Sequence, residues 1–271
     1  MQTLRRLGAA LLVIAAAYGL LCLVVRPSNE RAWSPDQAVL PYAEFRGPLV
    51  DVHRIRDFRY ISETQFTPGW YDKTFDLRRL ESVWFFVEPF GSFGGAAHTF
   101  VSFGFGGDDY VAISVEIRKE RGESFSPIGG LLRRYELMYV VGDERDLVAL
   151  RTNFRRDTVY AYPIRTTRER MRRMFVDMLA RANELRAHPE FYNTLTNTCT
   201  TNLVRHVNVI APGRIPFRAA VLFPGYSDRL AYDLGLIDTD LPFDAARARF
   251  AINARAQRFA GAPDFSRRIR E

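Results

Sequence analysis

Residues 97–120 read AHTFVSFGFGGDDYVAISVEIRKE and predict a β-hairpin, because two runs of alternating side chains flank turn-forming residues 106–109. In both runs the odd-numbered positions are apolar: Val101, Phe103, Phe105, Val111, Ile113, Val115 and Ile117. If both apolar rows are buried on the same side of the sheet, odd-numbered positions must pair with odd-numbered positions across the hairpin, and even-numbered with even-numbered. A three-residue loop gives this register and sets His98 opposite Glu116 or Arg118 on the more polar face.

The rest of the chain favours an α+β fold with an antiparallel sheet. Apolar or alternating runs predict strands within residues 48–61, 82–90, 135–141 and 146–152. The clearest helix is expected over residues 166–187, where Thr166 and Glu169 form a capping-box pattern. A second helix is expected to begin near residues 198–200, and an arginine-rich helix lies near the C-terminus.

The N-terminal segment predicts an uncleaved membrane anchor. Arg5 and Arg6 precede residues 7–25, which carry no charge. As a helix this run spans roughly 28 Å, close to the hydrocarbon thickness of a bilayer. A cleaved signal peptide is the alternative, but no small-residue cleavage site follows the run. We therefore expect residues 1–26 to anchor the chain and residues 33–271 to form one domain outside the cytoplasm.

The composition limits the classes of partner. The chain has 271 residues, of which 47% are hydrophobic, and this is enough for one sizeable core. The net charge is +7, but basic residues alternate with acidic ones, so we do not expect a nucleic-acid partner. The positive excess suits an anionic membrane surface or phosphate groups. Motifs typical of metal sites do not occur in the sequence, so we expect no metal and no cofactor.

Cys199 lies in TNTCTTN, residues 196–202, and Cys22 in the apolar run is the other cysteine of the chain. An unpaired thiol outside the cytoplasm suggests a reactive cysteine. Asn197 or Thr198 can cap the following helix, which places the thiol in its first turn. There the helix dipole favours a thiolate, and free N–H groups can hold an oxyanion. The alternative is a small buried thiol that packs the start of a helix.

His98 is the best candidate for the base that a Cys199 nucleophile needs. His206 lies two helical turns after Cys199, about 10 Å along the axis, which is too far for direct proton transfer. His188 precedes a proline at a helix end, so we expect it to cap that helix. His53 lies among charged residues on a strand, where a solvated side chain is expected.

A carboxylate opposite His98 would fix the tautomer of the imidazole, so Glu116 is the candidate third member of the site. Ser102, on the same face, and Arg118 are candidate substrate contacts. The alternatives are a solvent-facing His98 and a Glu116–Arg118 pair that is only structural.

Five segments resemble the N-terminal periplasmic domain of Lnb-type bacterial lipoprotein N-acyltransferases. They are AHTFVSFGF (97–105), SVEIRKE (114–120), GDERDLVALRTN (142–153), FYNTLTNTCTTN (191–202) and PGYSDRLAYDLGLI (224–237). The resemblance implies a permuted papain-like, NlpC-like thiol fold in which histidine precedes cysteine. This order is similar to that of the lecithin:retinol acyltransferase-like enzymes, whose acyl donors are phospholipids. The resemblance implies Cys199 as nucleophile and His98 as base. Asn197, Thr198 and Thr200, which surround the thiol at the expected helix start, are the candidate helix-cap and oxyanion residues.

The same resemblance implies a single-pass protein of the bacterial inner membrane with its body in the periplasm. The expected reaction moves an acyl chain from phospholipid through a Cys199 thioester to an amine, such as the N-terminus of a lipoprotein. A separate membrane protein is also an expected partner, because the typical full-length transferase carries a C-terminal multi-helix membrane region and this sequence shows one apolar span.

Two other functions fit the sequence pattern. One is a papain-like cysteine peptidase or amidase that acts on cell-wall peptide, and the other is a non-catalytic envelope protein. An acyltransferase requires an apolar groove for the lipid chain, and we expect Phe93, Phe100 and Phe103 to line part of it. The alternative for Phe103 is a place in the core.

Overall fold

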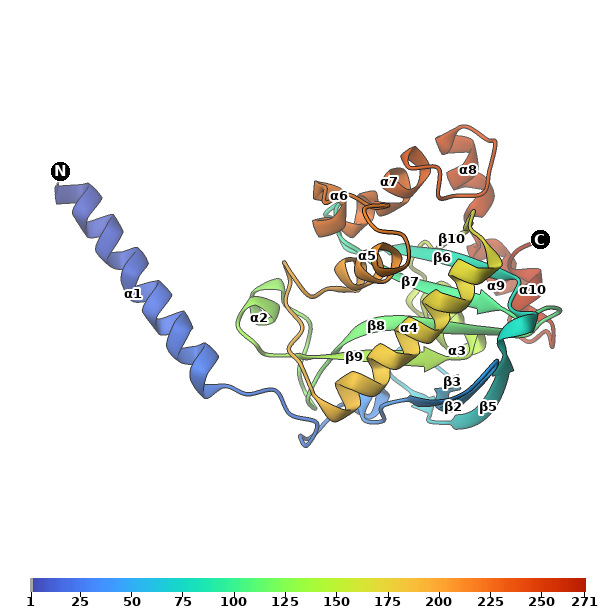
Figure 1. Ribbon diagram of the computed structural model, residues 1–271, viewed down its shortest axis with the longest axis horizontal. Coiled ribbons are helices and arrows are strands. Elements are labelled where there is room, and N and C mark those ends of the chain that lie inside the picture. The colour runs from blue at the N-terminus through green and yellow to red at the C-terminus, as the bar shows by residue number, and fades with distance from the viewer. Residues whose placement is uncertain (1) are drawn as a thin grey trace.

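The computed structural model describes residues 2–271 and shows a mixed α+β fold around one large sheet (Figure 1). The strands are β1 (Tyr42–Arg46), β2 (Leu49–Arg56), β5 (Trp70–Asp76), β6 (Ser82–Pro89), β7 (Ala97–Gly104), β8 (Tyr110–Arg118), β9 (Glu136–Gly142) and β10 (Tyr160–Pro163). In the described part of the chain this sheet has eight strands in the order β1-β2-β9-β8-β7-β6-β10, with β5 paired to β2. Two short strands, β3 (Arg59–Tyr60) and β4 (Phe66–Thr67), pair separately.

The predicted hairpin is confirmed as β7 and β8. Val101 pairs with Ile113, so odd positions face odd positions across the ladder. The N–H of Phe105 donates to the carbonyl of Asp109 at 2.8 Å, which leaves residues 106–108 as a three-residue loop. Strand alternation therefore fixed the register correctly, because a slip by one residue would move every apolar side chain to the wrong face.

Helices cover both faces of the sheet. They are α2 (Pro127–Leu131), α3 (Glu144–Ala149), α4 (Arg168–Ala187), α5 (Cys199–Ile210), α6 (Ala219–Leu222), α7 (Ser227–Asp233), α8 (Phe243–Phe250), α9 (Asn253–Arg258) and α10 (Phe265–Arg268), with short turns η1 (Pro35–Gln37), η2 (Leu77–Arg79) and η4 (Pro224–Tyr226). On one face α4 and α5 bury the odd-numbered row of the hairpin (Figure 1), where the ring centroids of Phe103 and Phe175 lie 5.1 Å apart. On the other face α3, α9 and α10 bury Phe100. The even-numbered face, expected to be polar, is therefore also part of a core.

The strand expected at residues 146–152 is wrong, because this segment forms α3 and the π-helical turn η3 (Leu150–Arg155). Asp143 caps α3 by accepting a hydrogen bond from the N–H of Arg145 at 2.8 Å. Asp146 is fully buried, and both of its oxygens accept hydrogen bonds of 2.8 Å from Arg56. Asp146 is the first residue of the predicted strand. Because its carboxylate is buried and hydrogen-bonded, the apolar pattern used for the prediction does not describe this segment.

Two helix ends also differ from expectation. The hydroxyl of Thr167 caps α4 by accepting from the N–H of Arg170, so the capping box expected from Thr166 and Glu169 is wrong. The predicted arginine-rich C-terminal helix is divided into α8, α9 and α10, and Pro263 separates the last two.

The helix α1 (Gln2–Val24) extends away from the body (Figure 1). Its residues Arg5–Val24 are long and apolar enough to cross a membrane, and none of this segment is buried inside the protein. This arrangement is compatible with a single membrane pass.

The chain between α1 and the sheet packs against the body instead of forming a loose linker. Trp33 is buried, and the Arg118 guanidinium lies 4.1 Å from the centroid of its ring. The same guanidinium donates to Asn29 Oδ1 (2.8 Å) and to the carbonyls of Gln37 (2.9 Å) and Ala38 (2.7 Å). Arg118 therefore fastens residues 29–38 to β8, and it is not available as the substrate contact that the sequence suggested.

Candidate active site

Cys199 is the first residue of α5 and is 7% exposed. The Thr198 hydroxyl caps this helix by accepting from the N–H of Thr201 (3.2 Å), while the Thr201 hydroxyl accepts from the N–H of Thr198 (2.7 Å). The side-chain oxygen of Asn197 accepts a hydrogen bond from Asn202 at 2.8 Å. The polar residues around the cysteine thus build a rigid helix start, with the thiol at the positive end of the helix dipole.

β7 and β8 diverge at the end of the hairpin where His98 and Glu116 lie. The last residues that pair between β7 and β8 at this end are Phe100 and Ser114. Beyond them β7 remains paired with β6, and β8 with β9. The Nε2 atom of His98 lies 3.2 Å from Oε1 of Glu116. The structure therefore brings these two side chains together as the register predicted.

The thiol of Cys199 and the imidazole of His98 interact and change the pKa of each other. Burial raises the pKa of Cys199, but a hydrogen bond from His98, its positive charge and hydrogen bonds from Thr99 lower that pKa to about 7. Burial lowers the pKa of His98, but Glu116 and Cys199 raise it to about 10. Near neutral pH the pair is therefore poised to exist as thiolate and imidazolium, in which the sulfur is nucleophilic and the histidine can donate a proton.

A hydrogen-bond network fixes the orientation of the imidazole. Nε2 of His98 lies 2.7 Å from the hydroxyl of Ser114, which donates to Glu116 at 2.6 Å. Because these groups occupy Nε2, Nδ1 is the nitrogen left to face Cys199. Burial raises the pKa of the Glu116 carboxyl, but His98 and Arg151 hold it well below its usual range.

Arg151 of η3 supports this network from the other face of the sheet. Its guanidinium, on a side chain that is 3% exposed, donates to Glu116 at 2.9 Å and to Glu88 at 2.7 Å. The buried positive charge keeps Glu116 ionised, so Glu116 can stabilise the imidazolium. Sequence reasoning assigned no such role to Arg151, because it placed residues 146–152 on a strand.

Two more residues contact the thiol region and were missed from the sequence. Thr99 helps to lower the pKa of Cys199, and its hydroxyl lies 3.0 Å from that of Thr200, which in turn lies 3.7 Å from the Cys199 sulfur. Burial and the negative charge of Cys199 raise the pKa of the Tyr192 hydroxyl. Strand alternation could have identified Thr99, because the residue after His98 points to the opposite face, where α5 lies.

The start of α5 also offers hydrogen-bond donors for an oxyanion. Within the described residues, no acceptor lies in hydrogen-bond geometry with the backbone N–H of Cys199 or of Thr200. The first N–H groups of a helix have no partner inside the helix, and they carry its positive partial charge. They therefore suit a negatively charged oxygen formed next to the sulfur.

Burial excludes three other residues that the sequence suggested as substrate contacts. Ser102, Phe100 and Phe103 are fully buried inside the sheet cores, so none of them can touch a substrate. Their burial follows from the helices that cover both faces of the hairpin. Phe93 is 58% exposed and lies outside the core.

The remaining histidines have structural partners. His206 is buried between the hydroxyl of Tyr139 and the carboxylate of Asp177, each 2.6 Å from a ring nitrogen. His188 is the C-cap of α4, as expected, and His53 pairs with an exposed aspartate on β5. In the part of the chain that the structure describes, no cluster of three or more His, Cys, Asp or Glu side chains is placed to hold a metal ion.

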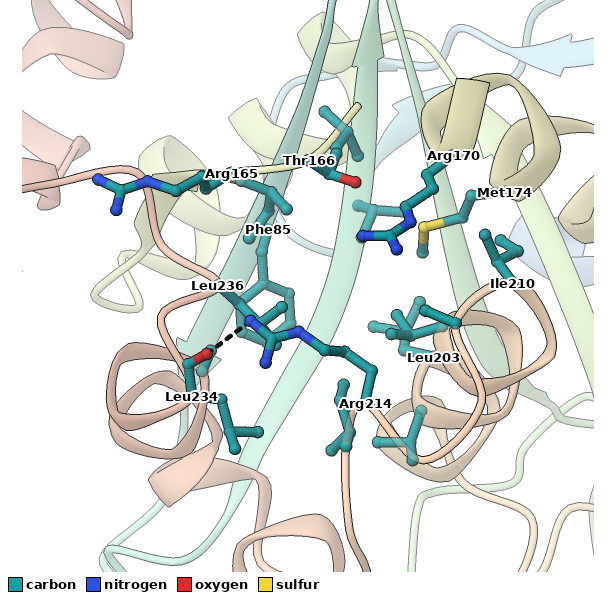
Figure 2. Close-up of a pocket in the computed structure, with 18 of the residues that line it drawn as sticks. Phe85, Arg165, Thr166, Arg170, Met174, Leu203, Ile210, Arg214, Leu234 and Leu236 are labelled. Carbon is teal, nitrogen blue, oxygen red and sulfur yellow. Dashed lines mark hydrogen bonds between the residues drawn. The ribbon is translucent and has the colours of Figure 1, made fainter. Parts of the chain in front are cut away.

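Thr200, the residue after the thiol, is one of the residues that line an apolar cavity of about 170 Å³. Figure 2 shows this cavity. Its walls come from α4, α5, α7, β6 and β7, and include Phe85, Met174, Leu203, Val204, Val207 and Leu236. An apolar cavity of about 150 Å³ accepts benzene, so this space accommodates about six carbon atoms.

Arginines lie around the opening of the cavity. Figure 2 shows the Arg170 guanidinium turned toward the cavity, whereas Arg165 points away from it. Arg214 crosses the opening and donates to the carbonyl of Leu234 at 2.7 Å. The site thus combines an apolar interior with positive charge at its rim.

The thiolate should be observable by alkylation with iodoacetamide in a Cys22→Ser background. Because the pKa of Cys199 is lowered to about 7, we expect the rate to rise with pH through about 7. Glu116→Gln removes the charge that stabilises the imidazolium, so it should slow alkylation at pH 6 by about three- to tenfold and have little effect at pH 9. Glu44→Gln, beside His53, is the matched control and should leave the profile unchanged. An unchanged profile in Glu116→Gln would contradict the coupling.

The sequence model of the Lnb N-terminal periplasmic domain matches residues 66–224, which is more than half of the chain. The matched segment contains Cys199, His98 and Glu116, together with the hairpin and both helices that cover its odd-numbered face. No curated protein and no solved structure matched the chain.

Proposed function

This chain belongs to the Lnb N-terminal periplasmic domain family, and on this basis we propose that it is a membrane-anchored thiol acyltransferase. The observation that carries the proposal is the pairing of His98 on β7 with Cys199 at the start of α5, where the next residue, Thr200, lines an apolar cavity. A thiolate and an imidazolium provide nucleophile and acid, and the cavity suits a lipid chain. His98 precedes Cys199 in the sequence, which supports a permuted papain-like arrangement.

In the first step the Cys199 sulfur attacks an ester carbonyl of a phospholipid. The carbonyl oxygen becomes an oxyanion, which the N–H groups of Cys199 and Thr200 stabilise. The carbon–oxygen bond then breaks, His98 gives its Nδ1 proton to the departing oxygen, and lysophospholipid leaves. A thioester remains on Cys199, and His98 is neutral.

In the second step a primary amine attacks the thioester. Neutral His98 accepts a proton from the amine nitrogen, an amide forms, and the sulfur leaves as a thiolate. Glu116 keeps the imidazole oriented through both steps, and it stabilises the charge that returns to the ring. The cycle restores the starting ion pair.

The location supports lipid substrates. α1 would hold the body on the periplasmic side of the inner membrane, where phospholipid and lipoprotein N-termini are both present at high effective concentration. The lipoprotein acceptor and a separate membrane protein partner belong to this proposal.

Intact-protein mass spectrometry after incubation with phospholipid vesicles tests the proposal directly. We expect an acyl-sized adduct on Cys199 that hydroxylamine removes and that Cys199→Ala lacks. Cleavage of cell-wall peptide without any adduct from phospholipid would favour the peptidase function instead.

The cavity predicts dependence on acyl-chain length. Val204 lines the cavity one turn after Thr200, so Val204→Phe should fill part of it. Exclusion of two methylene groups would cost about 1.6 kcal/mol, which lowers transfer from long-chain phospholipid by about tenfold. Reaction with a soluble acetyl ester should change by less than about twofold, because an acetyl group is too short to occupy the cavity.

Val209→Phe is the matched control for this variant. Val209 lies on the same helix but is 53% exposed, so an added ring there should leave both rates unchanged. Equal losses on long and short donors in Val204→Phe would contradict the role of the cavity.

A further inference from the structure

The segment around α2 contacts the membrane anchor. The hydroxyl of Tyr18 donates to the carbonyl of Leu131 (3.3 Å), and Arg133 donates to the carbonyls of Cys22 (3.1 Å) and Val25 (3.2 Å). Tyr18 lies six residues before the end of α1, which is about 9 Å along the helix. α2 therefore lies beside the last turns of the membrane-spanning segment, not beyond its end.

Exposed apolar side chains surround α2. The α2 patch consists of Phe125, Ile128, Leu132 and Leu195. Ile128 is the most exposed of them, at 67%. The turn that carries Leu195 is fixed to α2, because the Thr194 hydroxyl donates to the carbonyl of Pro127 at 2.7 Å.

A second group of exposed apolar side chains surrounds α6. The α6 patch consists of Phe93, Phe217, Phe223 and Tyr226. The rings of Phe93 and Phe223 lie 5.8 Å apart, and the N–H of Gly225 donates to the carbonyl of Gly95 at 3.0 Å. In Figure 1, α2 and α6 both lie at the side of the body that faces α1.

Each patch adjoins one member of the candidate active site. The turn with Leu195 leads directly into Cys199, and the loop with Phe93 leads directly into His98. Each member of the pair is therefore joined by a short segment of chain to one of the two patches. Scattered exposed apolar residues are normal on a protein surface, but two groups on the anchor side, each joined to one member of a reactive pair, indicate an interaction surface.

We infer that the α2 and α6 patches dock on the membrane that α1 spans, so that the Cys199–His98 pair faces the lipid headgroups. A bilayer is the expected occupant because the contacts with α1 set α2 at the depth of the membrane, where lipid surrounds any exposed side chain. Arg121 and Arg218 are exposed near the two patches and suit anionic headgroups. The inference rests on the membrane anchor of the proposed function and does not require acyl transfer.

Tryptophan substitution tests the docking in the full-length protein. Ile128→Trp, Phe223→Trp and Phe45→Trp are each reconstituted in vesicles of phosphatidylcholine and phosphatidylglycerol, with or without bromine on the acyl chains near the headgroup. Phe45 is the matched control, because it is 42% exposed, as Phe223 is, and lies on β1 outside both patches. The native tryptophans contribute background fluorescence, which is measured with the wild-type protein.

Bromine should reduce the added fluorescence of Ile128→Trp and Phe223→Trp by at least about twofold, because side chains seated about 5–10 Å into the interface lie at the depth of the quencher. The added fluorescence of Phe45→Trp should not change. An absence of quenching at position 128 or 223 would overturn the inference, since both patches must meet the same surface, and it would indicate a protein partner instead. Flotation with the vesicles reports anchoring separately, and Cys199→Ala should leave the quenching unchanged.

Discussion

Serine in place of Cys199 is expected to lower acyl release from phospholipid vesicles by at least about a thousandfold. The hydroxyl occupies nearly the same space as the thiol, so the capped helix start and the burial of this position should persist. A hydroxyl ionises far less readily than a thiol, however, so the ion pair with His98 does not form in this variant, and Glu116 still raises the pKa of the imidazole. An imidazole that favours its protonated form is a poor base for a serine hydroxyl, so little nucleophile forms.

The measurement is the amount of lysophospholipid formed over time by protein in vesicles. Cys22→Ser is the control for a cysteine-to-serine change, and it should retain full activity because Cys22 lies on α1, in the segment that is apolar enough to cross a membrane. Unfolding temperatures of the two variants should match the wild type. Continued release by both Cys199→Ser and Cys199→Ala would place the chemistry elsewhere in the protein.

Replacement of His98 by alanine should have the second-largest effect, a loss of about a hundred- to ten-thousandfold in acyl release near neutral pH. Two contributions disappear together. Without the imidazole, burial dominates the environment of Cys199 and its pKa rises, so less thiolate forms. In addition, no acid remains to protonate the departing oxygen.

Raising the pH separates these contributions. Alkylation of Cys199 in His98→Ala should recover as the pH rises and the thiolate forms, whereas acyl release should recover much less because the acid is still absent. His53→Gln is the control, since His53 lies on β2 and pairs with Asp72 outside the site. Full recovery of acyl release at high pH would show that His98 acts only through the thiolate population.

The parts of the site that the sequence could predict depend on local patterns. Strand alternation within residues 97–120 determines which side chains face each other, so the approach of His98 to Glu116 follows from the register. The polar residues around Cys199 similarly predict a capped helix start, and Thr198 is that cap. In both cases the partners lie close together in the chain or share one hairpin.

The parts that could not be predicted depend on contacts between distant segments. A strand pattern does not show whether its second face is solvated, and here α3, α9 and α10 bury that face together with Ser102. Arg118 is likewise buried because Trp33 and its neighbours, which lie far away in the sequence, pack over its side chain. The cavity is lined by segments spread over residues 83–236, so no single stretch of the sequence predicts it.

The packed connection between α1 and the body has a kinetic consequence. Trp33 and Arg118 hold residues 29–38 against β8, so the body should not swing freely about its anchor. The candidate active site then stays at a constant distance from the membrane. It therefore encounters only molecules that diffuse laterally within the bilayer that holds α1. Turnover should then follow the mole fraction of donor in that bilayer, so added inert lipid should slow the reaction even when the total amount of donor in the sample stays constant.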